Sequence, residues 1–116
     1  MTTDELQCIE ACNEAERVCL ARVSLPRVSD ENATIQQSHV FTISAEICAL
    51  TARVLARDAD FGARELASLC SKLCRSAADL SMKAEPADAT NELVEALIAC
   101  ADTCHIVALG THPATS

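Results

Sequence analysis

The sequence predicts an all-α fold, specifically an antiparallel up-down-up-down four-helix bundle that forms a single domain over residues 1–116. Glycine and proline are scarce, and within the chain they mark three loops, at Pro26, Gly62 and Pro86. The segments between these loops are rich in good helix formers. They run over residues about 3–24, 30–57, 60–83 and 87–109. Short connections between four such helices make sequential helices antiparallel neighbours.

The composition supports a helical core. Half of the residues are hydrophobic, yet Phe41 and Phe61 are the only aromatic residues. Alanine, leucine, valine, isoleucine and cysteine must therefore fill the interior. These small side chains suit closely spaced helices better than a thick sheet sandwich.

The first two segments each carry an apolar stripe at the helical period. Either Thr2 or Thr3 is a candidate N-cap for the first helix. Its stripe consists of Cys8, Cys12, Ala15 and Cys19. The stripe of the second helix consists of Phe41, Ala45, Cys48 and Ala52.

The last two segments repeat this pattern. Asp60 is a candidate N-cap for the third helix, and Pro86 suits the first turn of the fourth. The third stripe consists of Ala63, Ala67, Cys70, Cys74 and Ala77. The fourth consists of Leu93, Leu97, Cys100, Cys104 and Val107. Every cysteine lies on a stripe, so all eight thiols are expected to point into the bundle.

The thiols are also unevenly distributed along the bundle. In this topology one end collects the start of helix one, the end of helix two, the start of helix three and the end of helix four. Counting inward from that end at about 1.5 Å per residue, seven cysteines fall in the same half of the core. Cys19 lies deepest, past the midpoint. A metal site predicts such one-sided clustering, which a random scatter of buried cysteines does not.

The sequence also indicates the cellular compartment in which the cysteines lie. No secretory signal is visible in MTTDELQCIEACNEAERV, and no apolar run approaches the roughly 18 residues that a membrane span needs. We therefore expect a cytoplasmic protein, in which thiols stay reduced and clustered cysteines indicate metal or redox chemistry. The net charge of −8 argues against nucleic acid and anionic membranes as partners.

Thiol pairs at i and i+4 occur three times, as Cys8/Cys12, Cys70/Cys74 and Cys100/Cys104. Such side chains have Cβ atoms about 5–6 Å apart, so their sulfurs can lean toward one ion. Soft thiolates select Cu(I), Zn(II) and iron–sulfur clusters. Cu(I) needs only two or three sulfurs, whereas Zn(II) needs four, which two helices could supply together. The usual loop spacings of iron–sulfur sites are absent.

Two other interpretations of the cysteines stay open. Free cysteine behaves as a small hydrophobe, so a metal-free helical interaction domain could carry the same stripes. Paired CxxxC motifs on antiparallel helices could also form disulfides. No Gly-rich phosphate loop and no Ser/His/Asp set is present, and buried thiols argue against nucleophilic catalysis, so we expect no enzymatic activity.

The remaining candidate ligands give weaker signals. His39 and His105 fall off the stripes and are expected at the surface. His112 follows Gly110 near the end of the sequence. We expect it to be an ordinary terminal residue, and the alternative is that it assists metal uptake. Met82 is expected to serve packing at the other end of the bundle. Glu16 borders a stripe, but no Glu-x-x-His pair faces it, so a di-iron carboxylate site is unsupported.

Four sequence stretches carry a resemblance to a known family: CIEACNEAERVC, AEICALTARVL, LCSKLCRSA and ACADTCH. With inward CxxxC motifs on successive helices, the chain resembles the cysteine-rich four-helix-bundle copper-binding proteins, which include the bacterial copper storage proteins. The resemblance implies Cu(I) binding by core thiolates in a cytosolic protein, and a homotetramer of bundles.

The resemblance transfers to individual residues through the motifs. Six cysteines match by motif, namely Cys8, Cys12, Cys70, Cys74, Cys100 and Cys104. Cys19 and Cys48 match stripe positions more loosely. Because this sequence has fewer cysteines than the storage proteins and one apolar half of the core, we expect it to hold a few ions or one small cluster.

Overall fold

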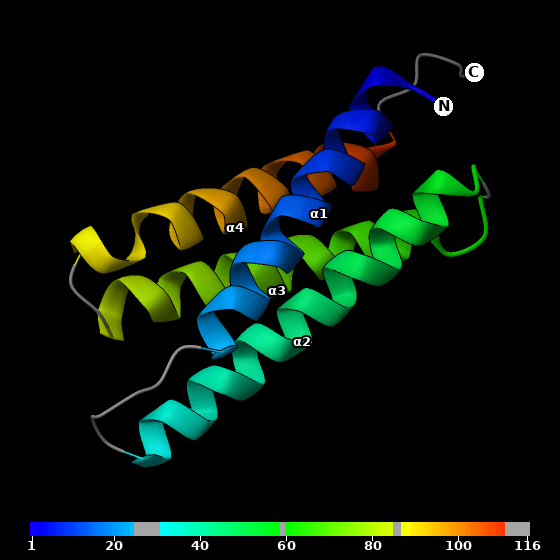
Figure 1. Cartoon of the computed structure of the whole chain (residues 1–116). Coiled ribbons are helices and arrows are strands. Elements are labelled where there is room, and N and C mark those ends of the chain that lie inside the picture. The colour runs from blue at the N-terminus through cyan, green and yellow to red at the C-terminus, as the bar shows by residue number, and fades with distance from the viewer. Residues whose placement is uncertain (25–30, 59, 85–86, 111–116) are drawn as a thin grey trace.

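The computed structural model is an elongated all-α bundle with extents of 52 × 21 × 17 Å (Figure 1). It describes residues 1–24, 31–58, 60–84 and 87–110, and side chains over 1–24, 37–58, 60–83 and 92–110. No strand occurs in these ranges. The four helices are α1 (Thr3–Ser24), α2 (Glu31–Ala56), α3 (Ala63–Ala84) and α4 (Ala87–Leu109). The predicted all-α class is confirmed, while Pro26 and Pro86 lie outside the described residues.

The helices form a closed ring. Each helix packs against the next one in the chain, and α1 packs against α4. Consequently α2 lies diagonally opposite α4, and α1 lies diagonally opposite α3. The start of α1, the end of α4 and the turn between α2 and α3 meet at one end of the bundle (Figure 1).

A reciprocal pair of hydrogen bonds starts α1. Thr2 Oγ1 accepts a hydrogen bond from the Glu5 amide at 3.1 Å, and Glu5 Oε1 accepts one from the Thr2 amide at 2.8 Å. This capping box satisfies two amides that the first helical turn leaves unpaired. The structure thus selects Thr2 over Thr3 as the N-cap.

The third helix begins later than the expected residue 60. Gly62 adopts a φ of +76°, which is incompatible with an α-helix, so α3 begins only at Ala63. The first helical bond runs from the Leu66 amide to the Gly62 carbonyl at 2.8 Å. Asp60 lies in the preceding turn, where its backbone carbonyl accepts a bond from the Ala63 amide at 3.3 Å.

The predicted stripes face the core. Their members are buried except Ala63 and Val107, which lie at the thiol-rich end and are partly buried. Beyond the thiols the core is filled by apolar side chains, including Phe41, Leu93 and Leu97. Met82 was expected to pack, but this prediction is wrong, because its side chain is 53% exposed.

Among the described residues, one helix is apolar and long enough to cross a membrane. The segment Gln37–Ala56 of α2 has a mean hydropathy of 1.3 and contains 20 residues. It does not form an unbroken apolar run in the sequence, because polar residues such as Ser44 and Glu46 interrupt the segment. Half of it is buried inside the bundle. Burial of this kind is typical of a core helix, so its hydropathy does not by itself indicate a membrane span.

Candidate metal centre

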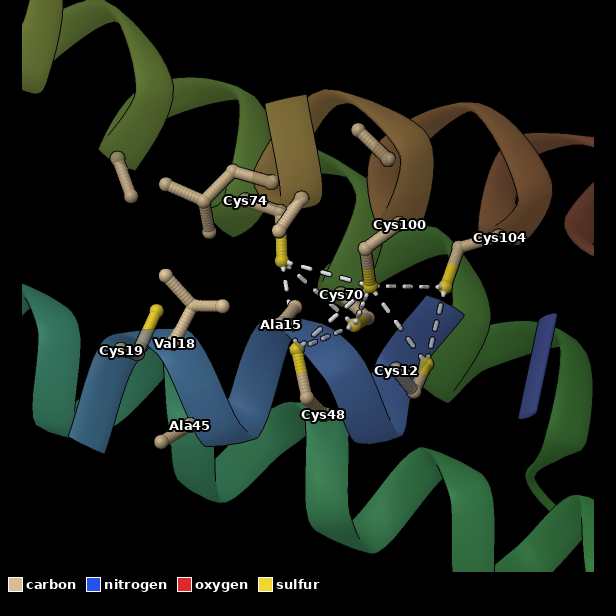
Figure 2. Close-up of a cluster of buried hydrophobic side chains, with 14 of the residues drawn as sticks. Cys12, Ala15, Val18, Cys19, Ala45, Cys48, Cys70, Cys74, Cys100 and Cys104 are labelled. Carbon is tan, nitrogen blue, oxygen red and sulfur yellow. Dashed lines mark hydrogen bonds between the residues drawn. The ribbon is translucent and has the colours of Figure 1, made fainter. Parts of the chain in front are cut away.

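All eight cysteine side chains are fully buried, each with 0% exposure, and all are free thiols. The four helices contribute unequally to this set. Helix α1 carries three cysteines, α2 one, α3 two and α4 two. Figure 2 shows that the following sulfurs are turned toward one another: those of Cys12, Cys48, Cys70, Cys74, Cys100 and Cys104.

A quartet of thiols from α2, α3 and α4 lies at the centre of this arrangement. It consists of Cys48, Cys70, Cys74 and Cys100. The Sγ of Cys48 lies 3.8 Å from that of Cys70, 3.5 Å from that of Cys74 and 3.6 Å from that of Cys100. The Sγ atoms of Cys70 and Cys74 are 4.0 Å apart, and each lies 3.7 Å from that of Cys100. Every pair of sulfurs in the quartet is thus in contact.

A trio of thiols from α1 and α4 lies beside the quartet, and consists of Cys8, Cys12 and Cys104. The Sγ atoms of Cys8 and Cys104 are 3.3 Å apart, which is the shortest of these sulfur–sulfur separations. The Sγ of Cys12 lies 4.0 Å from that of Cys8 and 3.7 Å from that of Cys104. The trio and the quartet meet at Cys100, whose Sγ is 3.6 Å from that of Cys12 and 3.9 Å from that of Cys104.

Two sets of these thiols are close enough to hold a metal ion. The first consists of Cys12, Cys48, Cys70 and Cys100, and the second of Cys8, Cys12 and Cys104, with the ligand atoms of each within 4.8 Å of one another. These two sets contain six thiols, and Cys74 joins them through its contacts with Cys48, Cys70 and Cys100. Seven thiols form one connected cluster, as the depth count along the sequence predicted.

Cys19 lies apart from this cluster. It is fully buried, but none of the sulfur–sulfur contacts within 4.0 Å among the described residues includes it. In Figure 2 its sulfur lies to one side of the network. Burial raises the pKa of the Cys19 thiol to about 12, with smaller contributions from Cys48 and Cys70. This thiol therefore stays protonated at neutral pH.

Within the cluster, hydrogen bonds between thiols distribute the protons unevenly. Hydrogen bonds from Cys104 and then Cys12 lower the pKa of Cys8. The pKa of Cys70 is also lowered, first by its hydrogen bond with Cys100. The pKa of Cys100 is raised, first by Cys104 and then by Cys12. A sulfur that accepts from its neighbours is stabilised as thiolate, while the donors keep their protons.

A hydroxyl that the sequence did not single out fixes two of the contributing helices. Ser71 Oγ donates a hydrogen bond to the Ala101 carbonyl at 2.8 Å, and so links α3 to α4. Ser71 and Ala101 directly follow Cys70 and Cys100 in the chain. The only sequence signal was a serine directly after a stripe cysteine, and periodicity alone does not identify its partner.

The two histidines that the structure describes do not join the cluster. His39 and His105 are exposed, in agreement with the sequence, and Glu16 is partly buried. His112 lies outside the described residues.

The pattern of inward thiols extends over all four helices, and so does the match to a protein-family model. The family model of copper storage proteins matches residues 1–109. The chain belongs to the copper storage protein family. The resemblance stated from the sequence is thus confirmed. No curated protein and no solved structure gives a significant match to the chain.

Membership of the copper storage protein family and the thiol cluster together indicate metal binding. The matched region contains all eight cysteines, and it ends at the last residue of α4. In this copper storage family member, a fully buried cluster of seven thiols is the candidate site for the metal.

Proposed function

We propose that this protein binds and sequesters Cu(I) through the seven clustered thiolates. The connected network of sulfur–sulfur contacts at 3.3–4.0 Å carries this proposal. Cu(I) is a soft ion, and cysteine thiolates are the soft ligands that select it. The proposed ligands are Cys8, Cys12, Cys48, Cys70, Cys74, Cys100 and Cys104.

Cys19 was also predicted as a ligand from its stripe. Its separation from the other thiols favours a packing role instead, since a bound ion needs at least a second sulfur within reach. The same separation limits the capacity of the bundle, and we propose a small cluster of ions at one end rather than a row of ions along the whole core.

Burial favours storage over catalysis. A catalytic thiol must reach its substrate, whereas each of the eight thiols here has no exposed surface. Burial also protects bound Cu(I) from water and from oxidants. We therefore propose a non-enzymatic role in copper homeostasis, in the cytoplasm, where thiols stay reduced.

Self-association of the bundle is part of the proposal, in line with the tetramer that the family resemblance implies. Ile43 and Leu50 lie two turns apart on the outside of α2 and are 50% and 43% exposed. Leu69 on α3 is 46% exposed. Sedimentation equilibrium tests this part, and a monomer at all concentrations would exclude it.

A Cu(I) titration under anaerobic conditions tests the main proposal. The reduced protein is titrated against a competing Cu(I) chelator, and reactive thiols are counted in denaturant before and after loading. We expect several Cu(I) ions to be taken from the chelator and seven thiols to become protected. Retention of the copper by the chelator, with all eight thiols still reactive, would contradict the proposal.

A further inference from the structure

The quartet of Cys48, Cys70, Cys74 and Cys100 has the shape of a complete coordination sphere. Its six sulfur–sulfur separations all lie between 3.5 and 4.0 Å. Four sulfurs placed tetrahedrally at about 2.3 Å from a zinc ion are about 3.8 Å from one another. The quartet thus matches a tetrahedral site on every edge to within about 0.3 Å, without any movement of the helices.

All four sulfurs of the quartet contact one another, which closes the arrangement into a tetrahedron. Two-coordinate or three-coordinate Cu(I) needs only a pair or a triangle of sulfurs, and the trio of Cys8, Cys12 and Cys104 supplies a triangle. A closed tetrahedron suits an ion that takes four ligands and leaves no open position, which is typical of structural zinc sites.

A competing quartet replaces Cys74 with Cys12. The Sγ atoms of Cys12, Cys48, Cys70 and Cys100 lie within 4.8 Å of one another. The quartet with Cys74 is tighter, since its longest edge is 4.0 Å. The tighter set also leaves Cys12 with its contacts to Cys8 and Cys104 in the trio.

We propose that Cys48, Cys70, Cys74 and Cys100 form a closed four-thiolate site for one divalent ion of the zinc class. This inference rests on the quartet's geometry and does not depend on Cu(I) binding. On binding, every sulfur of the quartet that still carries a proton releases it, and four thiolates form bonds to the divalent ion, which leaves two negative charges on the complex. The ion joins α2, α3 and α4, so its binding stabilises the folded bundle.

Titration of the reduced protein with Co(II) and with Zn(II) tests this site. Co(II) is the spectroscopic probe, because tetrahedral thiolate coordination gives it intense visible bands. We expect one equivalent of Co(II) to produce these bands and one equivalent of Zn(II) to remove them. Native mass spectrometry should find one zinc bound per chain. Octahedral Co(II), or a failure to bind one equivalent of zinc, would overturn the proposal.

Three matched cysteine-to-alanine variants identify the ligands. Cys74→Ala should weaken Co(II) binding by more than about 100-fold, since even changes beyond the direct ligands cost 10–100-fold. Cys12→Ala and Cys19→Ala should keep the tetrahedral spectrum and the affinity. Loss of the spectrum in Cys12→Ala, with retention in Cys74→Ala, would assign the site to the competing quartet and overturn the proposal.

A measurement on the unaltered chain covers the case in which a variant does not fold. The ¹¹³Cd NMR spectrum of the protein with one equivalent of Cd(II) should contain one resonance, coupled to the β-protons of the four quartet cysteines. Coupling to Cys12 in place of Cys74 would overturn the assignment. A parallel Cu(I) titration of the same protein separates the two proposals. If the protein binds Cu(I) but not Zn(II) or Co(II), only the tetrahedral site is contradicted. If it binds Zn(II) or Co(II) but not Cu(I), only Cu(I) sequestration is contradicted.

Discussion

The Sγ atoms of Cys48 and Cys100 lie 3.6 Å apart across the diagonal of the bundle, although 52 residues separate them in the chain. Because α2 and α4 are diagonal helices, this contact crosses the centre of the core. Cys100 also contacts the trio through Cys12 and Cys104. It is therefore the residue at which the two groups of thiols meet.

Replacement of Cys100 should impair Cu(I) binding more than replacement of any other single cysteine. Cys100→Ala removes the sulfur that the quartet and the trio share, so we expect a loss of more than about tenfold in Cu(I) affinity and fewer ions bound. Competition with a Cu(I) chelator measures both quantities. Cys19→Ala is the matched control, because it also removes a fully buried thiol. Equal losses in the two variants would show that the network has no special role.

Copper affinity should fall as the pH falls. Bound thiols must be deprotonated, so protons compete with Cu(I) for the sulfurs. The pKa of Cys12 is raised in the cluster, and so is that of Cys100. These thiols therefore release protons on binding. Chelator competition at about pH 7.5 and about pH 6, corrected for the chelator's own protonation, measures the change. A pH-independent affinity would argue against thiolate ligation.

The metal-free protein should lose stability at alkaline pH because of Cys19. Its thiol has a pKa of about 12 in the folded protein against an ordinary value of 9.0. Between these values the unfolded chain loses the proton while the folded chain keeps it, so the free energy of unfolding falls as the pH rises. Urea denaturation of the wild type and Cys19→Ala at about pH 8 and about pH 10.5 measures this contribution. The wild type should lose more stability over this interval, and identical losses would contradict the prediction.

The apolar part of the core should determine stability independently of the thiols. Phe41 is 1% exposed, so Phe41→Ala should lower the free energy of unfolding by about 3–5 kcal/mol. Phe61 is 94% exposed, and Phe61→Ala should change it by less than about 0.5 kcal/mol. Chemical denaturation of the two variants measures the difference. Similar values for both would mean that Phe41 does not anchor the core.

The capping box at the start of α1 should contribute measurably to stability. Thr2→Ala removes the side-chain acceptor for the Glu5 amide, and we expect a loss of about 1 kcal/mol. Thr3→Ala is the control, since Thr3 is the exposed first residue of the helix. Thermal denaturation compares the two variants. A larger loss in Thr3→Ala would contradict the assignment of Thr2 as the N-cap.

The periodicity of the sequence determined the helical stripes and the inward direction of all eight cysteines. The same count along the helices predicted that Cys19 lies apart from the others. The sequence marked a loop at Gly62 but placed the start of the third helix at about residue 60, because sequence patterns do not define a helix boundary to within a few residues. It also misplaced Met82, since proximity to an apolar face does not determine burial.

Which thiols meet across helices was decided only by the tertiary structure. Periodicity describes the face of a single helix, whereas a distance between sulfurs on different helices depends on their rotation, axial shift and side-chain rotamers. Packing sets these quantities, with contacts such as that of Ser71 with Ala101. The sequence therefore determined that seven of the eight thiols lie inside one half of the bundle. The tertiary structure decided that they form a quartet and a trio that meet at Cys100.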